Sequence, residues 1–314
     1  MKKGIVCLGE ALIDFIPLDA SNLTYQKSPG GAPANAAVGA ARLGARASFL
    51  GKVGDDILGR FLKETLDGYG VDTAAMVLGS EARTGAVFVT LSEDGERDFY
   101  FYIDPSADRF LKEEDLNGQL FEEHKLLHIG SISMISEPSK SATEKAVELA
   151  KRAGMIVSFD PNLRLSLWKD EETARAVIKW MLDKADILKV SEEELEFLTG
   201  KQSIEEGLAS LSGYEIPFTL VTLGAEGSYL SAGGKLVKVP AMKVEAVDTT
   251  GAGDAYVSGM LYKINERGDG VNGLSEEELW EIGRFASISG GLAASTKGAM
   301  TALPTLEEVE RLLK

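Results

Sequence analysis

The strongest candidate for chemistry is segment 248–255, which reads Asp-Thr-Thr-Gly-Ala-Gly-Asp-Ala and runs into a helical pattern. A Gly-Ala-Gly turn at a helix start leaves several backbone N–H groups free. Together with the helix dipole these groups form an anion hole suited to phosphate. Asp254 falls in the first helical turn, where its carboxylate can accept a proton from a hydroxyl group attacking phosphorus. An Asp that merely favours a helix start after a glycine turn is the structural alternative.

A second candidate is segment 30–37, Gly-Gly-Ala-Pro-Ala-Asn-Ala-Ala, which continues to Gly44. Paired glycines let a ligand approach the backbone closely, and Asn35 can both donate to and accept from a hydroxyl group. Pro33 suits the first helical position and Gly44 suits the helix end. Because the small alanines also fit tight helix packing, both binding and packing remain open for this segment.

Polar residues also recur where the expected parallel strands end. They are Asp14, Ser131, segment 160–164 (Asp-Pro-Asn-Leu-Arg), Lys189 with 191–194, and 222–224. Each is weak evidence alone, since loops are polar for solvation as well. Ligands of doubly wound sheets bind at the carboxyl edge of the strands, so together these exits predict one crevice there.

Composition and missing motifs exclude several other chemistries. The 314 residues include 33 basic and 49 acidic ones, and a net charge of −16 disfavours nucleic acid and anionic membranes as partners. Two histidines and one cysteine make a zinc site or a Ser-His-Asp triad improbable. The P-loop pattern G-x-x-x-x-G-K-[ST] is absent, and the G-x-G-x-x-G match at 268–273 follows a helix instead of the required strand.

The elements that must position these residues alternate along the chain. Strand-like runs cover 5–9, 47–53, 125–130, 155–160, 187–190 and 218–223. Helical patterns cover 56–66, 139–153, 172–184 and 192–198, and after about residue 250 they cover 252–267, 276–294 and 305–313. This alternation predicts an α/β fold, in which a mostly parallel sheet carries helices on both faces.

Two segments interrupt the alternation. Residues 15–28 predict a short hairpin, and 84–103 predict two strands joined by a turn at 92–95. Together they predict a small β-sheet lid that stands off the main domain. The second arm, 98–103, is aromatic on both faces, which ordinary packing or contact with another subunit would equally explain.

Compartment is indicated by two weak features. No apolar run approaches the roughly 20 residues of a membrane span, and the apolar run at the N-terminus is shorter than a signal peptide needs. Cys7 lies in an apolar run, which predicts a buried thiol and fits a reducing compartment. We therefore expect a cytoplasmic protein without a membrane partner.

These segments resemble the signatures of the ribokinase-like (PfkB) carbohydrate kinases, and the chain is most similar to the fructokinases of that family. The resemblance rests on six segments in order, 9–15, 30–35, 94–97, 159–164, 189–194 and 248–254. It implies a single domain over 1–314, a three-layer α/β/α sandwich with lid segments at about 12–30 and 83–104. It further implies ATP-dependent, in-line transfer of a phosphoryl group to the 6-hydroxyl of D-fructose, with ATP and Mg²⁺ as cofactors.

The resemblance also implies roles for individual residues. Asp254 would be the general base, beside the anion hole of Gly251, Ala252 and Gly253. The sugar would be bound by Asp14, Gly30, Gly31, Asn35, Arg97, Tyr102 and Arg164. The nucleotide would be bound by Asn162, Lys189, Thr222, Gly224, Gly227, Ser287 and Gly290. Glu194 would organise Mg²⁺, and Asp248 and Thr250 match a site where many members hold a monovalent cation such as K⁺.

One departure from the family pattern and several alternatives stay open. Many members carry Asn-x-x-Glu at the metal, where this chain has Ser191 before Glu194. Arg97 and Arg164 could grip a carboxylate, so a 2-keto-3-deoxygluconate kinase is the main alternative. A nucleoside kinase is a further one, and a sugar-binding relative without turnover a distant one. Ribokinases carry a sugar-binding acid where this chain has Gly130, which argues against ribose. A monomer and a lid-mediated homodimer are both compatible with the sequence.

Overall fold

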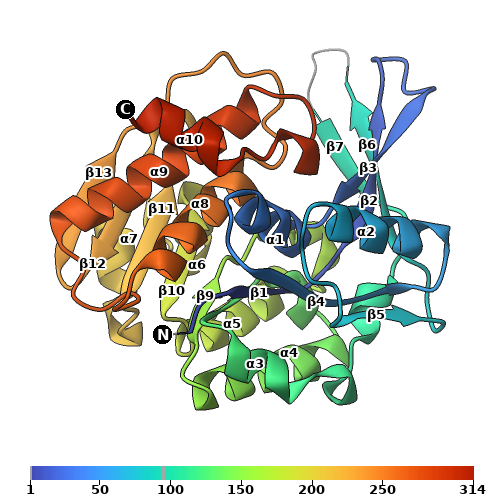
Figure 1. Ribbon diagram of the computed structural model, residues 1–314, viewed down its shortest axis with the longest axis horizontal. Coiled ribbons are helices and arrows are strands. Elements are labelled where there is room, and N and C mark those ends of the chain that lie inside the picture. The colour runs from blue at the N-terminus through green and yellow to red at the C-terminus, as the bar shows by residue number, and fades with distance from the viewer. Residues whose placement is uncertain (1, 93–96) are drawn as a thin grey trace.

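A computed structural model describes residues 2–92 and 97–314. Within them a nine-stranded sheet runs in the order β13-β12-β11-β10-β9-β8-β1-β4-β5 (Figure 1). Its strands are β1 (Ile5–Leu8), β4 (Ala47–Gly54), β5 (Met76–Gly79), β8 (Leu126–Ile129), β9 (Ile156–Phe159), β10 (Ile187–Ser191), β11 (Phe218–Thr222), β12 (Ser228–Ala232) and β13 (Lys235–Val239). Neighbouring strands pair in parallel from β11 to β5, while β12 and β13 are antiparallel additions at one edge.

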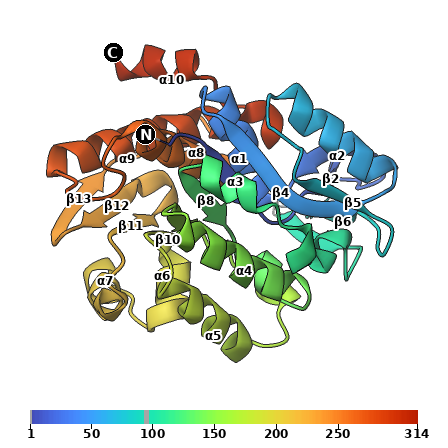
Figure 2. The same ribbon diagram turned by 60° about the horizontal axis from the view of Figure 1, so that its bottom comes forward.

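Helices cover both faces of this sheet, which confirms the predicted α/β architecture (Figure 2). They are α1 (Ala32–Arg42), α2 (Ile57–Gly68), α3 (Gly118–Glu123), α4 (Ser139–Arg152), α5 (Glu171–Leu182), α6 (Glu192–Thr199), α7 (Ile204–Ser210), α8 (Ala252–Glu266), α9 (Glu276–Ala294) and α10 (Leu306–Leu313). Strand β1 shows why both faces are apolar: Ile5 and Cys7 join the core beneath α1 and α8, and Val6 and Leu8 join the core beneath α4 and α5. Because successive side chains of a strand point to opposite faces, a doubly covered strand must be apolar throughout.

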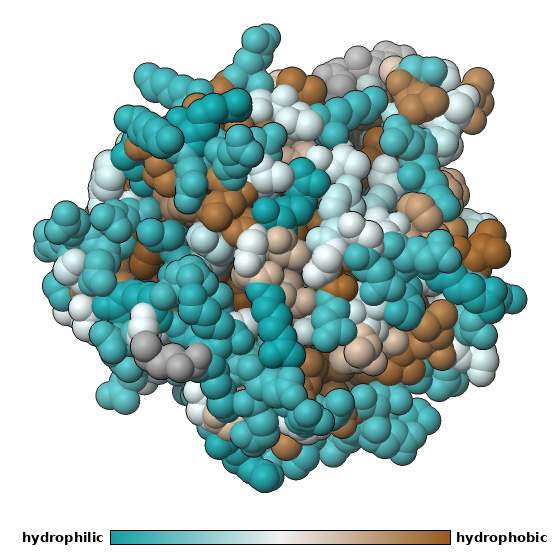
Figure 3. All heavy atoms as spheres, in the orientation of Figure 1, coloured by the Kyte–Doolittle hydropathy of each residue, from teal (hydrophilic) through white to brown (hydrophobic). Residues whose placement is uncertain are grey.

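A second, four-stranded sheet stands beside the first, as the sequence predicts. Its strands are β2 (Leu12–Pro17), β3 (Tyr25–Gly30), β6 (Gly85–Leu91) and β7 (Arg97–Phe101), in the order β3-β2-β6-β7. Residues 93–95 of the predicted turn and residues 94–96 of segment 94–97 lie outside the described residues. Leu18 and Leu23, in the link between β2 and β3, are exposed, and hydrophobic side chains are visible at this end of the molecule (upper right in Figure 3).

Some elements escaped prediction. The antiparallel pair β12 and β13, the edge strand β5 and the short helices α3 and α7 carry weak periodic patterns. The glycine-rich segment 268–273 lies between α8 and α9, as predicted. No helix in the described ranges is long and apolar enough to cross a membrane.

Candidate active site

A cavity of about 670 Å³ opens at the carboxyl edge of the parallel strands. The order of the strands reverses there, because the chain leaves β1 for β4 on one side and returns to β8 on the other. Its lining brings together most of the predicted site: Asp14, Gly31, Asn35, Asn162, Arg164, Lys189, Asp248, Thr250, Gly251, Gly253 and Asp254. Side chains from separate elements therefore converge as the predicted strand exits required.

Asp254 lies in the first turn of α8 and is held from the opposite helix. Asn35 of α1 donates a hydrogen bond of 2.7 Å from Nδ2 to Oδ2 of Asp254. Burial raises the pKa of Asp254 to about 6, the Asn35 hydrogen bond lowers it, and the charge of Asp160 raises it. Near neutral pH the carboxylate is therefore ionised yet basic enough to take a proton.

Two glycines at the start of α8 differ in what they do for the loop. Gly251 adopts φ +78° at the N-cap, and a Cβ atom there would lie 3.2 Å from Cα of Ala299. A Cβ atom on Gly253 would meet no other atom within 4 Å, because this residue faces the cavity. The backbone of Gly251 thus shapes the turn, while Gly253 leaves room beside the helix N-terminus for an anion.

Asp14 and the glycine pair form another wall of the cavity. Burial raises the pKa of Asp14 to about 7, the charge of Asp254 adds to this, and Arg164 opposes it. A Cβ atom on Gly30 would lie 2.2 Å from Oδ2 of Asp14, so a side chain at position 30 would displace the carboxylate. Gly30 therefore adjoins the cavity without lining it.

Glu10 also lines the cavity, and the sequence analysis missed it as a site residue. The signal was available, because an acidic residue two positions after the buried strand β1 lies where strand exits converge. Val87, Phe99 and Phe101 of the second sheet also line the cavity, and Phe99 is 49% exposed.

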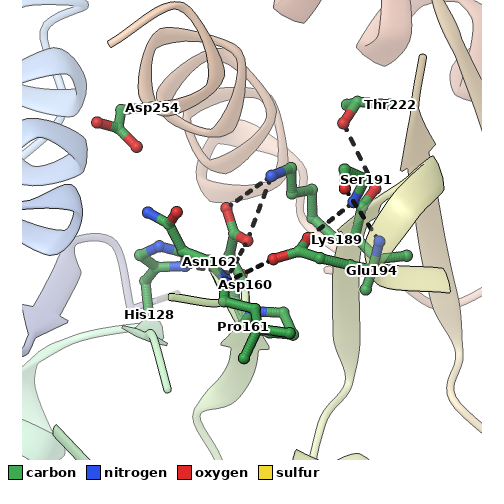
Figure 4. A network of polar contacts seen from close by, with 12 residues as sticks. His128, Asp160, Pro161, Asn162, Lys189, Ser191, Glu194, Thr222 and Asp254 are labelled. Carbon is green, nitrogen blue, oxygen red and sulfur yellow. Dashed lines mark hydrogen bonds and ion pairs between the residues drawn. The ribbon is translucent and has the colours of Figure 1, made fainter. Parts of the chain in front are cut away.

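A buried ion pair forms the floor beside β9 and β10 (Figure 4). Lys189 Nζ lies 3.0 Å from Oδ2 of Asp160. Burial opposes the charge of Lys189, but Asp160 and Glu194 raise its pKa, so the ammonium group stays charged. Asn162, whose φ is +44°, donates its backbone N–H to Oδ1 of Asp160.

Both histidines are structural. Burial lowers the pKa of His128 to about 3, and its Nδ1 lies 3.1 Å from the Ser158 hydroxyl. His124 is buried against Ser48 and the carbonyl of Leu120. Neither histidine is among the residues that line the cavity.

Glu194 lies next to the cavity, in a groove that it shares with Ser191 and Asn162. Its Oε1 accepts from the backbone N–H of Leu163 at 2.7 Å and its Oε2 from that of Ser191 at 2.8 Å. Each carboxylate oxygen has two lone pairs, so water on a cation can still bind. No cluster of three or more acidic, His or Cys ligands occurs in the described part of the chain. These donors fit Mg²⁺ held mainly by water and phosphate oxygens.

Asp248 precedes the glycine turn of α8 and is 4% exposed. Its Oδ1 accepts from the backbone N–H of Thr250, and its Oδ2 accepts from that of Gly298. A buried carboxylate among backbone groups is compatible with a monovalent cation, because hard cations prefer oxygen ligands.

The remaining predicted residues do not line the cavity. Tyr102 is 74% exposed and packs its ring against Phe88. The side chain of Arg97 lies outside what the structure describes. Six further predicted residues, at the start of α8, at or after the end of β11 and in α9, are not part of the lining: Ala252, Thr222, Gly224, Gly227, Ser287 and Gly290. Gly290 reaches this region, since a Cβ atom there would lie 3.1 Å from the carbonyl oxygen of Ala252.

Comparison with known proteins gives one consistent result. The family model for pfkB family carbohydrate kinases matches residues 2–306. Fructokinase-1 of Oryza sativa subsp. japonica is 45% identical over 316 residues, covering 99% of this chain and 97% of the relative.

Solved structures agree with this result. A double mutant of Vibrio cholerae O395 fructokinase, with fructose, ADP and a potassium ion bound, has a TM-score of 0.91 at 40% identity, covering 100% of both chains. Fructokinase from Xylella fastidiosa with bound ATP has a TM-score of 0.93 at 36% identity, covering 100% of this chain and 98% of the other.

Proposed function

The chain belongs to the pfkB family of carbohydrate kinases, and on that premise we propose that it is a fructokinase, transferring the γ-phosphoryl group of ATP to the 6-hydroxyl of D-fructose. The observation that carries this proposal is the pairing of Asp254 with Asn35 at the wall of a cavity next to the glycine turn of α8. Base and anion hole thus share one space large enough for a sugar and a phosphate chain.

The chemistry follows from these positions. The sugar lies between Asp14, Gly31 and the lid, with its primary hydroxyl group against the carboxylate of Asp254. Asp254 takes the hydroxyl proton as the oxygen attacks phosphorus in line with the departing ADP oxygen. The N–H groups at 251–253 stabilise the negative charge on the transferring group. Asp254 returns its proton to solvent after the product leaves.

Binding of the nucleotide is assigned to the opposite side of the cavity. Asn162 and Lys189 face the phosphates, and Thr222, Gly224, Gly227, Ser287 and Gly290 follow the rest of the nucleotide around the start of α8. Glu194 would hold Mg²⁺ through water, and the ion would supply charge neutralisation at the phosphate oxygens. A potassium ion beside Asp248 and Thr250 is supported by the Vibrio cholerae relative, which binds one.

Arg164 is the feature that favours a second candidate, a 2-keto-3-deoxygluconate kinase, because a guanidinium group in the cavity could bind a substrate carboxylate. The carboxylates of Asp14 and Asp254 line the same cavity and, when ionised, would repel that carboxylate. This balance favours a neutral sugar, and the sugar relatives named above are fructokinases.

The test compares fructose, 2-keto-3-deoxygluconate, ribose and adenosine as acceptors at equal concentration, with ATP and Mg²⁺. We expect the highest kcat/KM for fructose. A value for fructose below about a hundredth of another acceptor's, a gap of nearly 3 kcal/mol, would contradict the assignment.

Three further proposals concern the cellular location, the assembly and the partners of the enzyme. A cytoplasmic location is supported by the buried, unpaired Cys7, which suits a reducing compartment. A monomer and a homodimer formed through the second sheet are the two assemblies proposed. A net charge of −16 supports small molecules, not nucleic acid, as partners.

A further inference from the structure

Glu10 is a buried acid in the cavity wall that has no part in the proposed mechanism. It lies in the short link between β1 and β2 and is 4% exposed. Its Oε1 accepts a hydrogen bond of 3.1 Å from the backbone N–H of Ala32, the first residue of α1. Its Oε2 is buried without a hydrogen-bond partner in the described part of the chain. The link therefore holds a carboxyl group of which half is unpaired.

Contacts lead from Glu10 to the base in three steps. The bond to Ala32 fixes the start of α1, and the next contact lies within that first turn, where Asn35 donates its backbone N–H to the carbonyl of Gly31 at 2.8 Å. The Asn35 side chain then donates to Asp254. Gly31 also packs on the main chain of the link, since a Cβ atom there would lie 2.5 Å from the Glu10 carbonyl oxygen. Movement of Glu10 would thus shift the turn that holds Asp254.

The surroundings of Glu10 favour its neutral form. A second, small cavity of about 20 Å³ separates it from Asp108 of the 3₁₀ helix η1 (Ala107–Phe110). The charged groups that line the two cavities together with Glu10 are Asp104, Asp108 and Arg109 around η1, and Asp14, Asp160, Arg164, Lys189, Asp248 and Asp254 in the main cavity. These six aspartates outnumber the three basic residues Arg109, Arg164 and Lys189. An ionised, enclosed carboxylate with one unpaired oxygen is therefore costly.

The pKa of Glu10 is shifted in the direction that this geometry predicts. Burial raises the pKa of Glu10 to about 8, backbone N–H groups lower it, and the charges of Asp108 and Asp254 raise it. Asp108 is itself buried, and burial raises its pKa while the Ser106 hydroxyl lowers it. Glu10 consequently carries its proton at neutral pH and loses it in mildly alkaline solution.

We propose that Glu10 is a positioning residue which, as the neutral acid, holds the first turn of α1 and through Asn35 keeps Asp254 in place. The inference rests on the proposed function, because it assigns Glu10 a part in the same reaction. Ionisation of Glu10 adds a negative charge beside Asp14 and Asp254 and draws its unpaired oxygen toward water. The turn is then displaced and transfer slows.

The experiment uses the full chain and compares E10Q and E10A with the wild type from pH 5.5 to 9.5, with fructose and ATP. Gln keeps an acceptor for the Ala32 N–H and places a neutral donor where the acid has its O–H group, whereas Ala removes both. We expect E10A to lower kcat at least tenfold, since small misplacements at a reacting group cost up to about 100-fold. E10Q should exceed E10A at least tenfold and should lack the alkaline fall of kcat/KM near pH 8 that the wild type shows.

The matched control is E308A, which removes a glutamate that accepts from the Thr305 N–H at the start of α10, away from the cavity. It should keep the wild-type kcat and the alkaline fall. An alkaline fall in E10Q identical to that of the wild type, or an E10A kcat equal to that of the wild type, would overturn the proposal. If E10A does not fold, the E10Q profile decides alone. A wild-type chain without fructose turnover overturns the proposed function first, before any variant is compared.

Discussion

Asn35 of α1 and Asp254 of α8 are 219 positions apart in the sequence. A hydrogen bond of 2.7 Å joins Nδ2 of Asn35 to Oδ2 of Asp254. The bond uses one oxygen of the carboxylate, and the other remains for a substrate hydroxyl group. Asn35 Oδ1 is itself buried without a partner in the described residues. The pair therefore fixes the orientation of the base and helps to set its basicity.

Removing the Asn35 donor should shift the acid limb of the activity profile. The hydrogen bond lowers the pKa of Asp254, which burial has raised to about 6. In N35A this pKa rises further, so the active, ionised form is lost at a higher pH. A profile of kcat/KM from pH 5 to 8 should show the limb displaced upward from that of the wild type. An acid limb of N35A at the same pH as that of the wild type would show that Asn35 does not influence the pKa of Asp254.

The two glycines of the turn should respond differently to substitution. G253V fills the open space at the anion hole, so kcat should fall at least 100-fold, as for loss of an oxyanion-hole donor. Its melting temperature should stay within about 2 °C of the wild type. G251A instead strains a left-handed residue packed on Ala299 and should lower stability by about 1–2 kcal/mol. Equal kcat in G253V and the wild type would argue against an anion hole at this turn.

Glu194 should both position the loop after β9 and contribute to the Mg²⁺ dependence of the activity. In E194Q one of the two N–H groups, of Leu163 or Ser191, faces an amide NH₂ instead of an acceptor. We expect kcat/KM to fall about tenfold and the Mg²⁺ concentration for half-maximal rate to rise, because charge and loop position are both lost. E193Q is the matched control: it changes the same charge on the same helix turn without the Leu163 contact. Similar losses in both variants would assign the effect to charge alone.

Asp14 should lower the stability of the folded chain at alkaline pH while it contributes to fructose binding. Its pKa in the folded chain, about 7, lies above the unfolded value, so the folded state binds more protons between about pH 4 and 7. The free energy of unfolding contributed by this group is therefore highest in acid and falls as pH rises through 7. D14N should raise the melting temperature at pH 8 by roughly 2 °C, the effect of about 0.5–1 kcal/mol in a chain of this size, while weakening fructose binding. A melting temperature below that of the wild type at pH 8 would contradict this.

Sequence patterns predicted what depends on local chemistry. The apolar runs located every parallel strand of the nine-stranded sheet except β5, and the glycine turn correctly predicted a helix start that places Asp254 at the cavity. Asp14, Asn162 and Lys189 converge on the cavity as predicted, although Asp14 lies within β2 and Lys189 within β10 and neither follows a strand end.

Other features depend on tertiary contacts that no periodicity encodes. The Asn35–Asp254 bond joins distant helices, and the burial of Glu10 arises where α1 closes over the β1–β2 link. Tyr102 follows a strand whose alternate side chains, Phe99 and Phe101, face the cavity, and its own ring packs on Phe88. The aromatic pattern on both faces gave no indication of which face meets the ligand.

The role of Asp254 as the general base is tested most directly by the rate of fructose-dependent ADP formation by D254N, together with the fructose affinity of this variant by calorimetry. Without the base, kcat should fall about 10²- to 10⁴-fold, while the Kd for fructose stays within several-fold of the wild type. A D254N enzyme that turns over fructose at the wild-type rate would contradict the account.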